Sequence, residues 1–163
     1  MSPEAEPDTY DVLLRTDPDE RARPGRLFLD DREFVVAPSR HGLSTRLAAD
    51  ALGGLLLGLP EELGLYDPHA VSRTEATHHP DAVRVRYADL DGLAPFARPT
   101  GFALHLRVAG RDGRLRLAFR SNDERAETVA LARALRDRAR EAGAEPDVFD
   151  PGGRTRLLSL GGS

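Results

Sequence analysis

Apolar and non-apolar residues alternate in three short runs in the second half of the chain, Val83–Tyr87, Phe102–Val108 and Arg114–Arg120. Because successive side chains on a strand point to opposite faces, each run predicts a strand with one packed face and one face in water. The positions facing water carry seven basic side chains and no acid. These are Arg84, Arg86, His105, Arg107, Arg114, Arg116 and Arg120. The pattern predicts a basic sheet face.

Further strands are expected earlier in the chain. Tyr10–Arg15 is a short apolar run, and Arg26–Leu29 and Arg32–Ala37 lie on either side of two aspartates, which favour a tight turn. A strand is also predicted around Ala70–Ala76. Residues 89–92, with two aspartates and a glycine, are typical of a turn.

The segment Leu43–Leu59 predicts a helix, because Leu43, Leu47 and Ala51 recur every four residues. Its uncharged part, Ala51–Leu59, is too short to cross a bilayer. We expect it to pack in the core or between subunits, with contact to a lipid surface as the alternative.

A second helix is predicted from a capping box at Ser121–Glu124 to the stop signal of Gly143. Its apolar residues form one stripe that should face the sheet. They are Thr128, Leu131, Ala132, Leu135 and Ala139.

The composition bounds the class of protein. A chain of 163 residues is long enough for one domain with a core, and the absence of cysteine excludes disulfides and thiolate chemistry. The N-terminal residues show no secretory signal pattern, so the expected location is the cytoplasm, with peripheral membrane contact as the alternative. The formal net charge is −4, and the 23 Lys and Arg positions are all arginine.

The charge is unevenly distributed along the chain. Residues 1–35 hold ten acids and five arginines, whereas residues 82–120 hold eight arginines and three aspartates. Two interpretations stay open. The N-terminal acids lie against the basic face of the same molecule, or the face attracts an anionic partner.

Three pieces of the chain, in this order, resemble the pleckstrin-homology-like superfold, particularly its bacterial and GRAM-type members. They are the hairpin Gly25–Val36, the strand and turn of Val85–Leu93, and two strands around a glycine turn followed by a closing helix. The resemblance covers about residues 10–142. It implies an α+β fold, a bent, partly open antiparallel β-barrel capped by a C-terminal α-helix.

The segment 43–59 departs from the family pattern and is expected to be an extra apolar helix inserted after the first strands. Residues 1–9 are expected to form a flexible tail, and residues 143–163 a Gly/Pro-rich tail. The resemblance by itself implies no activity, because this fold hosts lipid, peptide and protein binders.

Two clusters of side chains are candidates for ligand binding. Arg15, Arg21 and Arg23 have the loose spacing found in phosphoinositide-binding members, but intervening acids would repel a phosphorylated headgroup. His78 and His79, with His69 nearby, lack a defined metal-ligand spacing. No nucleophile elbow or phosphate-binding loop is present, so no catalytic residue, cofactor or metal is expected.

We therefore expect a non-catalytic binding or adaptor module whose basic face takes an acidic protein segment or another anionic ligand. One alternative is a domain that associates with membranes through residues 43–59. Another is an enzyme with a site near His69, His78 and His79. A homo-oligomer stays open, and nucleic acid is disfavoured because interleaved aromatics and a net basic charge are lacking.

Overall fold

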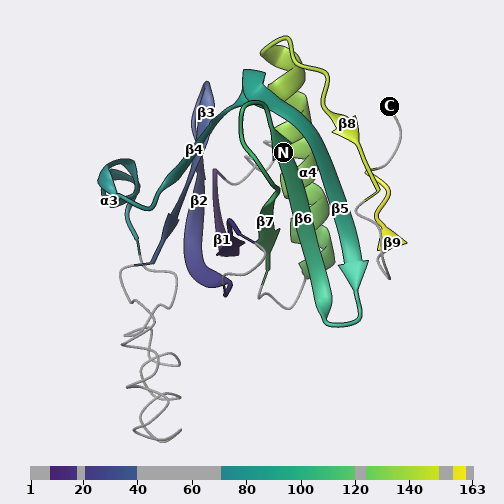
Figure 1. The fold of residues 1–163 in the computed structure, drawn as a ribbon, viewed down its shortest axis with the longest axis horizontal. Coiled ribbons are helices and arrows are strands. Elements are labelled where there is room, and N and C mark those ends of the chain that lie inside the picture. Colours follow the sequence, from purple (N-terminus) through teal and green to yellow (C-terminus); the bar gives the residue numbers. More distant parts are fainter. Residues whose placement is uncertain (1–7, 18–20, 40–70, 120–123, 151–155, 161–163) are drawn as a thin grey trace, which may run out of the picture.

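A computed structural model describes residues 8–17, 21–39, 71–119, 124–150 and 156–160. They form a sheet with the strand order β4-β3-β2-β1-β7-β6-β5-β8, and β9 also pairs with β5 (Figure 1). Within the described ranges β4 does not pair with β5, so the sheet is not closed into a barrel. The prediction of a partly open antiparallel sheet with a C-terminal helix is confirmed at this level.

The first four strands run as an antiparallel meander. They are β1 (Thr9–Arg15), β2 (Arg23–Leu29), β3 (Glu33–Pro38) and β4 (Val83–Arg86). Three of them match the strands expected from the early apolar runs, and β4 matches the run at residue 83. Gly25 permits the close approach of β2 to β3, because a Cβ there would lie 2.4 Å from the carbonyl oxygen of Ala37.

Three more strands form a second meander, β5 (Leu90–Arg98), β6 (Gly101–Val108) and β7 (Leu115–Ala118), and β7 pairs with β1. The turn predicted at residues 89–92 is wrong. A short 3-10 helix, η1 (Tyr87–Asp89), is followed at once by β5. Gly92 and Pro95 hide this strand in the sequence, because glycine and proline are rare inside strands; Gly92 lies next to a bulge, where glycine is tolerated.

The strand predicted around residues 70–76 is also wrong, because the helix α3 (Arg73–His78) occupies most of this segment. Ser72 and Glu75 form its capping box. The Glu75 amide donates to Ser72 Oγ (3.1 Å), and the Ser72 amide donates to Glu75 Oε2 (2.8 Å). Ala76 of α3 is buried with Phe28 and Val35 on the side of the sheet opposite the C-terminal helix.

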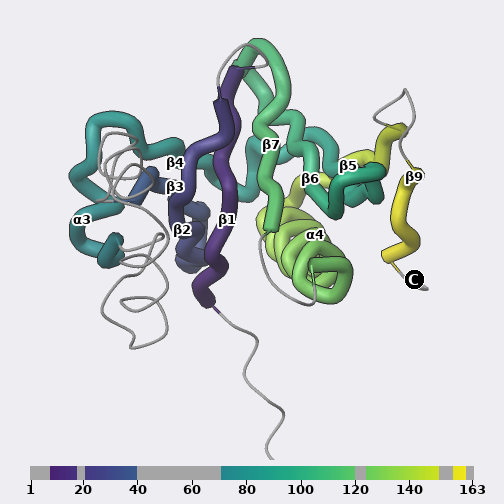
Figure 2. Tube along the Cα trace, turned by 90° about the horizontal axis from the view of Figure 1, so that it is seen from below, coloured from purple at the N-terminus to yellow at the C-terminus, as the bar shows by residue number. Residues whose placement is uncertain are grey.

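The main core lies between the sheet and the helix α4 (Glu124–Glu141). Figure 2 shows the strands curving around α4, which is seen nearly end-on. The alternation predicted for β6 and β7 is confirmed, because Leu104, Leu106, Leu115 and Leu117 have no exposed surface. The predicted stripe of α4 is buried as well, in full.

The C-terminal segment expected to be a tail contributes two short strands to the sheet. β8 (Asp147–Val148) pairs in parallel with β5, and β9 (Arg156–Leu157) pairs with it in antiparallel. The expected apolar helix at 43–59, the cap residues before Glu124, His69 and Arg120 lie outside the described residues. Among the helices described, none is long and apolar enough to cross a membrane.

Candidate anion-binding face

The structure divides the predicted basic face into two parts. Arg84 and Arg86 lie on β4 at one end of the sheet, whereas the predicted residues on β6 and β7 lie beyond three intervening strands, β3, β2 and β1. Between the two parts, α3 covers an apolar cluster on the same side of the sheet. The cluster consists of Phe28, Val35, Ala37, Val71 and Ala76. The seven predicted positions therefore do not form one continuous surface.

The arginines of β4 are neutralised within the chain. Arg84 Nη1 lies 3.4 Å from Glu33 Oε1, and Arg84 Nη2 donates to the carbonyl oxygen of Thr77 (2.9 Å). Arg86 Nε donates to Asp89 Oδ2 (2.9 Å). At this end of the sheet, an acid from the N-terminal part of the chain does lie against a predicted basic residue.

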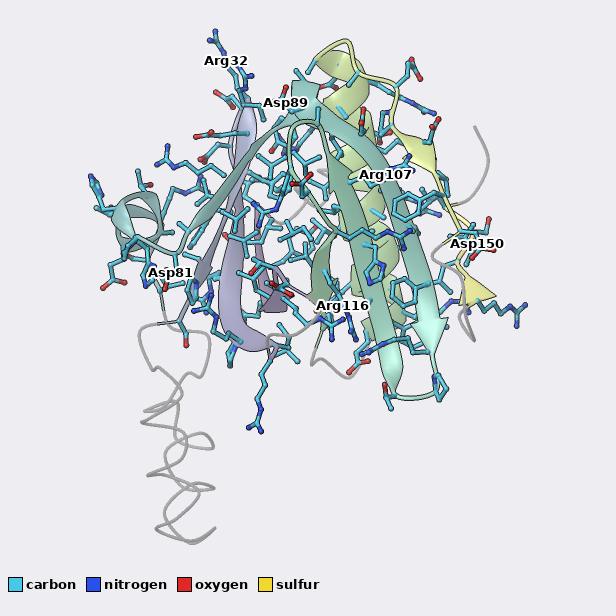
Figure 3. The ribbon with its side chains drawn as sticks, in the orientation of Figure 1. Arg32, Asp81, Asp89, Arg107, Arg116 and Asp150 are labelled. Carbon is cyan, nitrogen blue, oxygen red and sulfur yellow. The ribbon has the colours of Figure 1, made fainter. Side chains whose placement is uncertain are left out.

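The strand register brings the remaining basic residues together on β1, β7 and β6. Arg15 lies directly opposite Arg116, and Arg116 lies directly opposite His105. Arg107 lies opposite Gly92 of β5. Figure 3 shows Arg107 and Arg116 over the strands, on the side turned away from α4. We call this surface the basic face; its members are Arg15, Arg98, His105, Arg107, Arg114 and Arg116.

Two arginines at the centre of the basic face lack an acidic partner in the described part of the chain. No carboxylate of those residues lies within 4.0 Å of the guanidinium of Arg15 or Arg116. Like charges directly opposite each other across two strands destabilise a sheet. Within the described residues, Arg15 and Arg116 therefore form a like-charge pair with no carboxylate beside it.

Burial and neighbouring charge keep His105 neutral. Desolvation is the main reason that the pKa of His105 falls to about 4, and the charges of Arg114, Arg15 and Arg98 lower it further. Burial also lowers the pKa of Arg98, and the charge of Glu124 opposes this effect. His105 was predicted as one of the basic binding residues, but at neutral pH it contributes a neutral ring.

Beside the charged residues, the basic face has a floor of small and apolar side chains. Phe96, Ala103 and Ala118 are buried there, with Leu13 packed against them. The ring of His105 meets the ring of Phe96 edge to face, with 4.5 Å between their centroids. A buried apolar surface next to a guanidinium group lowers the local dielectric constant. The attraction between that guanidinium and a carboxylate is then stronger, because less water screens the two charges.

Two members of the basic face, Arg15 and Arg98, were missed by the sequence analysis. Arg15 was weighed as part of a loop with Arg21 and Arg23, although Val12 and Leu14 alternate with it on a predicted strand. That alternation was a usable signal for its outward direction. Arg98 lies at the end of β5, a strand that the sequence does not predict because its start, residues 90–92, resembles a turn, so no pattern places this side chain.

A polar cleft of about 750 Å³ lies at the β2–β3 turn, away from the basic face. Its lining residues are Asp8, Leu29, Asp30, Asp31, Arg32, Glu33, Arg73, Arg86 and Arg138. Arg73 pairs with Asp30, and Arg138 lies 3.7 Å from Asp8. Beneath the turn, the buried hydroxyl of Tyr87 donates to the carbonyl oxygen of Asp30, and desolvation raises the pKa of Tyr87 to about 12. Acids and bases therefore balance in this cleft.

The two described histidines of the candidate metal site, His78 and His79, lie within hydrogen-bond distance of nearby backbone atoms. His78 Nδ1 lies 2.9 Å from the carbonyl oxygen of Thr74, and His79 Nδ1 accepts from the amide of Asp81 (3.0 Å). Within the described ranges, no three acidic or histidine side chains group as a metal site would need.

Comparison of the chain with family models, curated proteins and solved structures finds no match. The surface itself is therefore the basis for a functional proposal.

Proposed function

We propose that this protein is a non-catalytic binding module of pleckstrin-homology-like fold, and that its basic face binds an acidic segment of another protein. The observation that carries the proposal is the cross-strand pair of Arg15 and Arg116, which has no carboxylate partner in the described residues. Such a pair costs stability in the free protein, and a partner's carboxylates would offset that cost.

The arrangement of the chain supports the fold part of the proposal. The hairpin β2–β3, the strand β4, the pair β6–β7 and the helix α4 follow in the order of the three pieces that carry the sequence resemblance, although residues 90–92 begin β5 in place of the expected turn. The sheet bends around α4 and stays open, as expected for this superfold (Figure 2). This likeness in architecture does not by itself select a ligand.

The dimensions of the face favour an extended peptide. Neighbouring strands lie about 4.8 Å apart, so the step from Arg15 across β7 to His105 spans about 10 Å. An extended chain covers that distance in about three residues. An acidic segment of about three residues laid across these strands can therefore reach from Arg15, past Arg116, to His105. Its carboxylates would lie at the two arginines and its apolar side chains at Phe96 and Ala103.

Fluorescence anisotropy with a labelled octapeptide of alternating Asp and Ser tests the proposal. In Arg116→Glu, the new carboxylate faces Arg15 across the strands, so the fold should keep or gain stability while peptide binding weakens about tenfold or more. Arg84→Glu on β4 is the matched control, and it should leave the affinity for the peptide unchanged.

Equal loss of affinity in both variants would show that the peptide responds to total charge and not to the basic face. Absence of binding by the unaltered protein would refute the proposal outright. A melting temperature measured for each variant separates lost binding from lost structure.

A further inference from the structure

The basic face already holds one acidic and aromatic segment, which belongs to the chain itself. Residues 145–150 read Glu-Pro-Asp-Val-Phe-Asp and follow α4. Their strand β8 pairs with β5, and the amide of Phe149 donates to the carbonyl oxygen of Leu93 (3.2 Å). This segment is therefore an acidic and aromatic stretch of the chain that lies against the basic face.

Two guanidinium groups of the basic face contact the ring of Phe149. The Cζ atoms of Arg107 and Arg114 lie 4.6 Å and 4.9 Å from the ring centroid, and both distances are typical of cation–π contacts. Arg107 Nη2 also lies 3.8 Å from Asp147 Oδ2. One arginine thus contacts both an aromatic ring and a carboxylate of the same segment.

Gly92 makes room for this arrangement on β5. A Cβ at Gly92 would lie 2.9 Å from Phe149 Cδ1 and 2.9 Å from Arg107 Nη2. The ring and the guanidinium therefore rest directly on the backbone of the strand. We call Gly92, Arg107 and Arg114 the aromatic seat.

The segment pairs with β5 over a short ladder and is largely exposed to solvent. Its ladder with β5 involves two residues, the side chain of Asp147 is 81% exposed and Val148 is 45% exposed. Sections with little buried surface and short ladders open at low free-energy cost. Among the described residues, β9 pairs with β5 only at Phe96 and Ala97, so the part of β5 at Gly92 and Leu93 becomes an exposed edge once β8 leaves. Exposed edges accept an added strand from a partner.

We propose that the partner of this protein presents an extended segment with an aromatic residue flanked by carboxylates, and that this segment displaces residues 147–150 from the aromatic seat. The inference rests on the proposed function, because the same basic face supplies the charge. The chain's own segment then acts as a tethered competitor, and its removal raises the affinity for the partner.

The test uses a fluorescein-labelled peptide with the sequence of residues 143–151, added to the full-length protein. In Phe149→Ala the seat is vacant, so the peptide should bind about tenfold or more tightly than it binds the unaltered chain, where it competes with a tethered segment. A second peptide, with alanine in place of the phenylalanine, should lose most of this gain.

Two further variants act as controls. Leu157→Ala changes an exposed residue of β9, away from the seat, and should leave peptide binding as in the unaltered chain. Gly92→Ala combined with Phe149→Ala fills the seat and should abolish the gain. Without the Phe149 ring, the added methyl group meets Nη2 and Nε of the flexible Arg107 side chain, which can shift, so the melting temperature should change little.

The outcomes separate this inference from the proposed function. If the Asp-Ser octapeptide binds but both 143–151 peptides bind every variant equally, the basic face functions and the aromatic seat does not. If the octapeptide and the 143–151 peptides all fail to bind, the proposed function fails together with the inference.

Discussion

On the basic face, the surroundings of His105 decide whether its side chain is charged. His105 stands in sequence among arginines and was expected to add to their charge, yet its ring is packed against Phe96 and surrounded by three guanidinium groups. Desolvation and like charge act in the same direction on an imidazole, and both favour its neutral form. The residue is therefore better described as part of the apolar floor than as a cation.

The pH dependence of stability follows from this shift. Unfolded His105 binds a proton near pH 6.5, whereas the folded residue does so near pH 4. Acid therefore favours the unfolded state, and the free energy of unfolding should be at its full value above pH 6.5 and decline as the pH falls toward 4.

Urea denaturation between pH 6.5 and 5 checks this expectation, because most carboxylates remain ionised over that range. His105→Gln should show a flatter decline than the unaltered protein. Parallel curves for the two proteins would mean that His105 titrates alike in the folded and unfolded chain.

At the level of elements, α4 and the two meanders depend on each other. The helix supplies the inner wall of the core through its buried stripe, and without it the concave side of the open sheet would face water. The basic face lies on the convex side, so its arginines keep their spacing only while α4 holds the curvature.

Leu131→Ala should therefore destabilise the whole sheet. Leu131 is fully buried, and replacing a buried leucine by alanine typically costs about 2–5 kcal/mol in the free energy of unfolding. Arg125→Ala, at an exposed position of the same helix, should stay within about 0.5 kcal/mol of the unaltered protein. Chemical denaturation of both variants measures the difference, and similar midpoints would show that α4 is not anchored by this stripe.

At the scale of the whole molecule, the charges are sorted by position in the sheet. Around β2, β3 and β4, arginines pair with acids, as in Arg26 with Asp11 at 2.7 Å and Arg84 with Glu33 at 3.4 Å. On β1 and β7, Arg15 and Arg116 face each other. A net negative protein can thus present a local positive field toward one partner.

Salt should act on binding through that field. Raising the ionic strength from about 0.01 M to about 0.1 M shortens the Debye length from about 30 Å to about 10 Å, so the dissociation constant for the Asp-Ser octapeptide should rise. Arg116→Glu should show a smaller change with salt than Arg84→Glu does. Identical salt dependence in the two variants would place the peptide elsewhere on the molecule.

Several elements could be predicted because their signals are local. The alternation in β6 and β7 and the spacing of the α4 stripe indicate which side of each element is buried. Burial requires an apolar side chain at each position on that side, so the pattern is visible in the local sequence. The same patterns put Arg107, Arg114 and Arg116 outside the core. Where local signals conflicted, the prediction failed. Gly92 and Pro95 hid β5, and the capping box of Ser72 was overlooked before α3.

The sequence by itself determined which faces of the strands and of α4 are apolar, because burial follows the period of each element. Only the tertiary structure decided which strands are neighbours. Pairing of β1 with β7 sets Arg15 against Arg116, although they are a hundred residues apart in the chain, and it leaves Arg84 at the far end with its own acid. Periodicity carries no information on such long-range register, which is fixed by the packing of the whole sheet around α4.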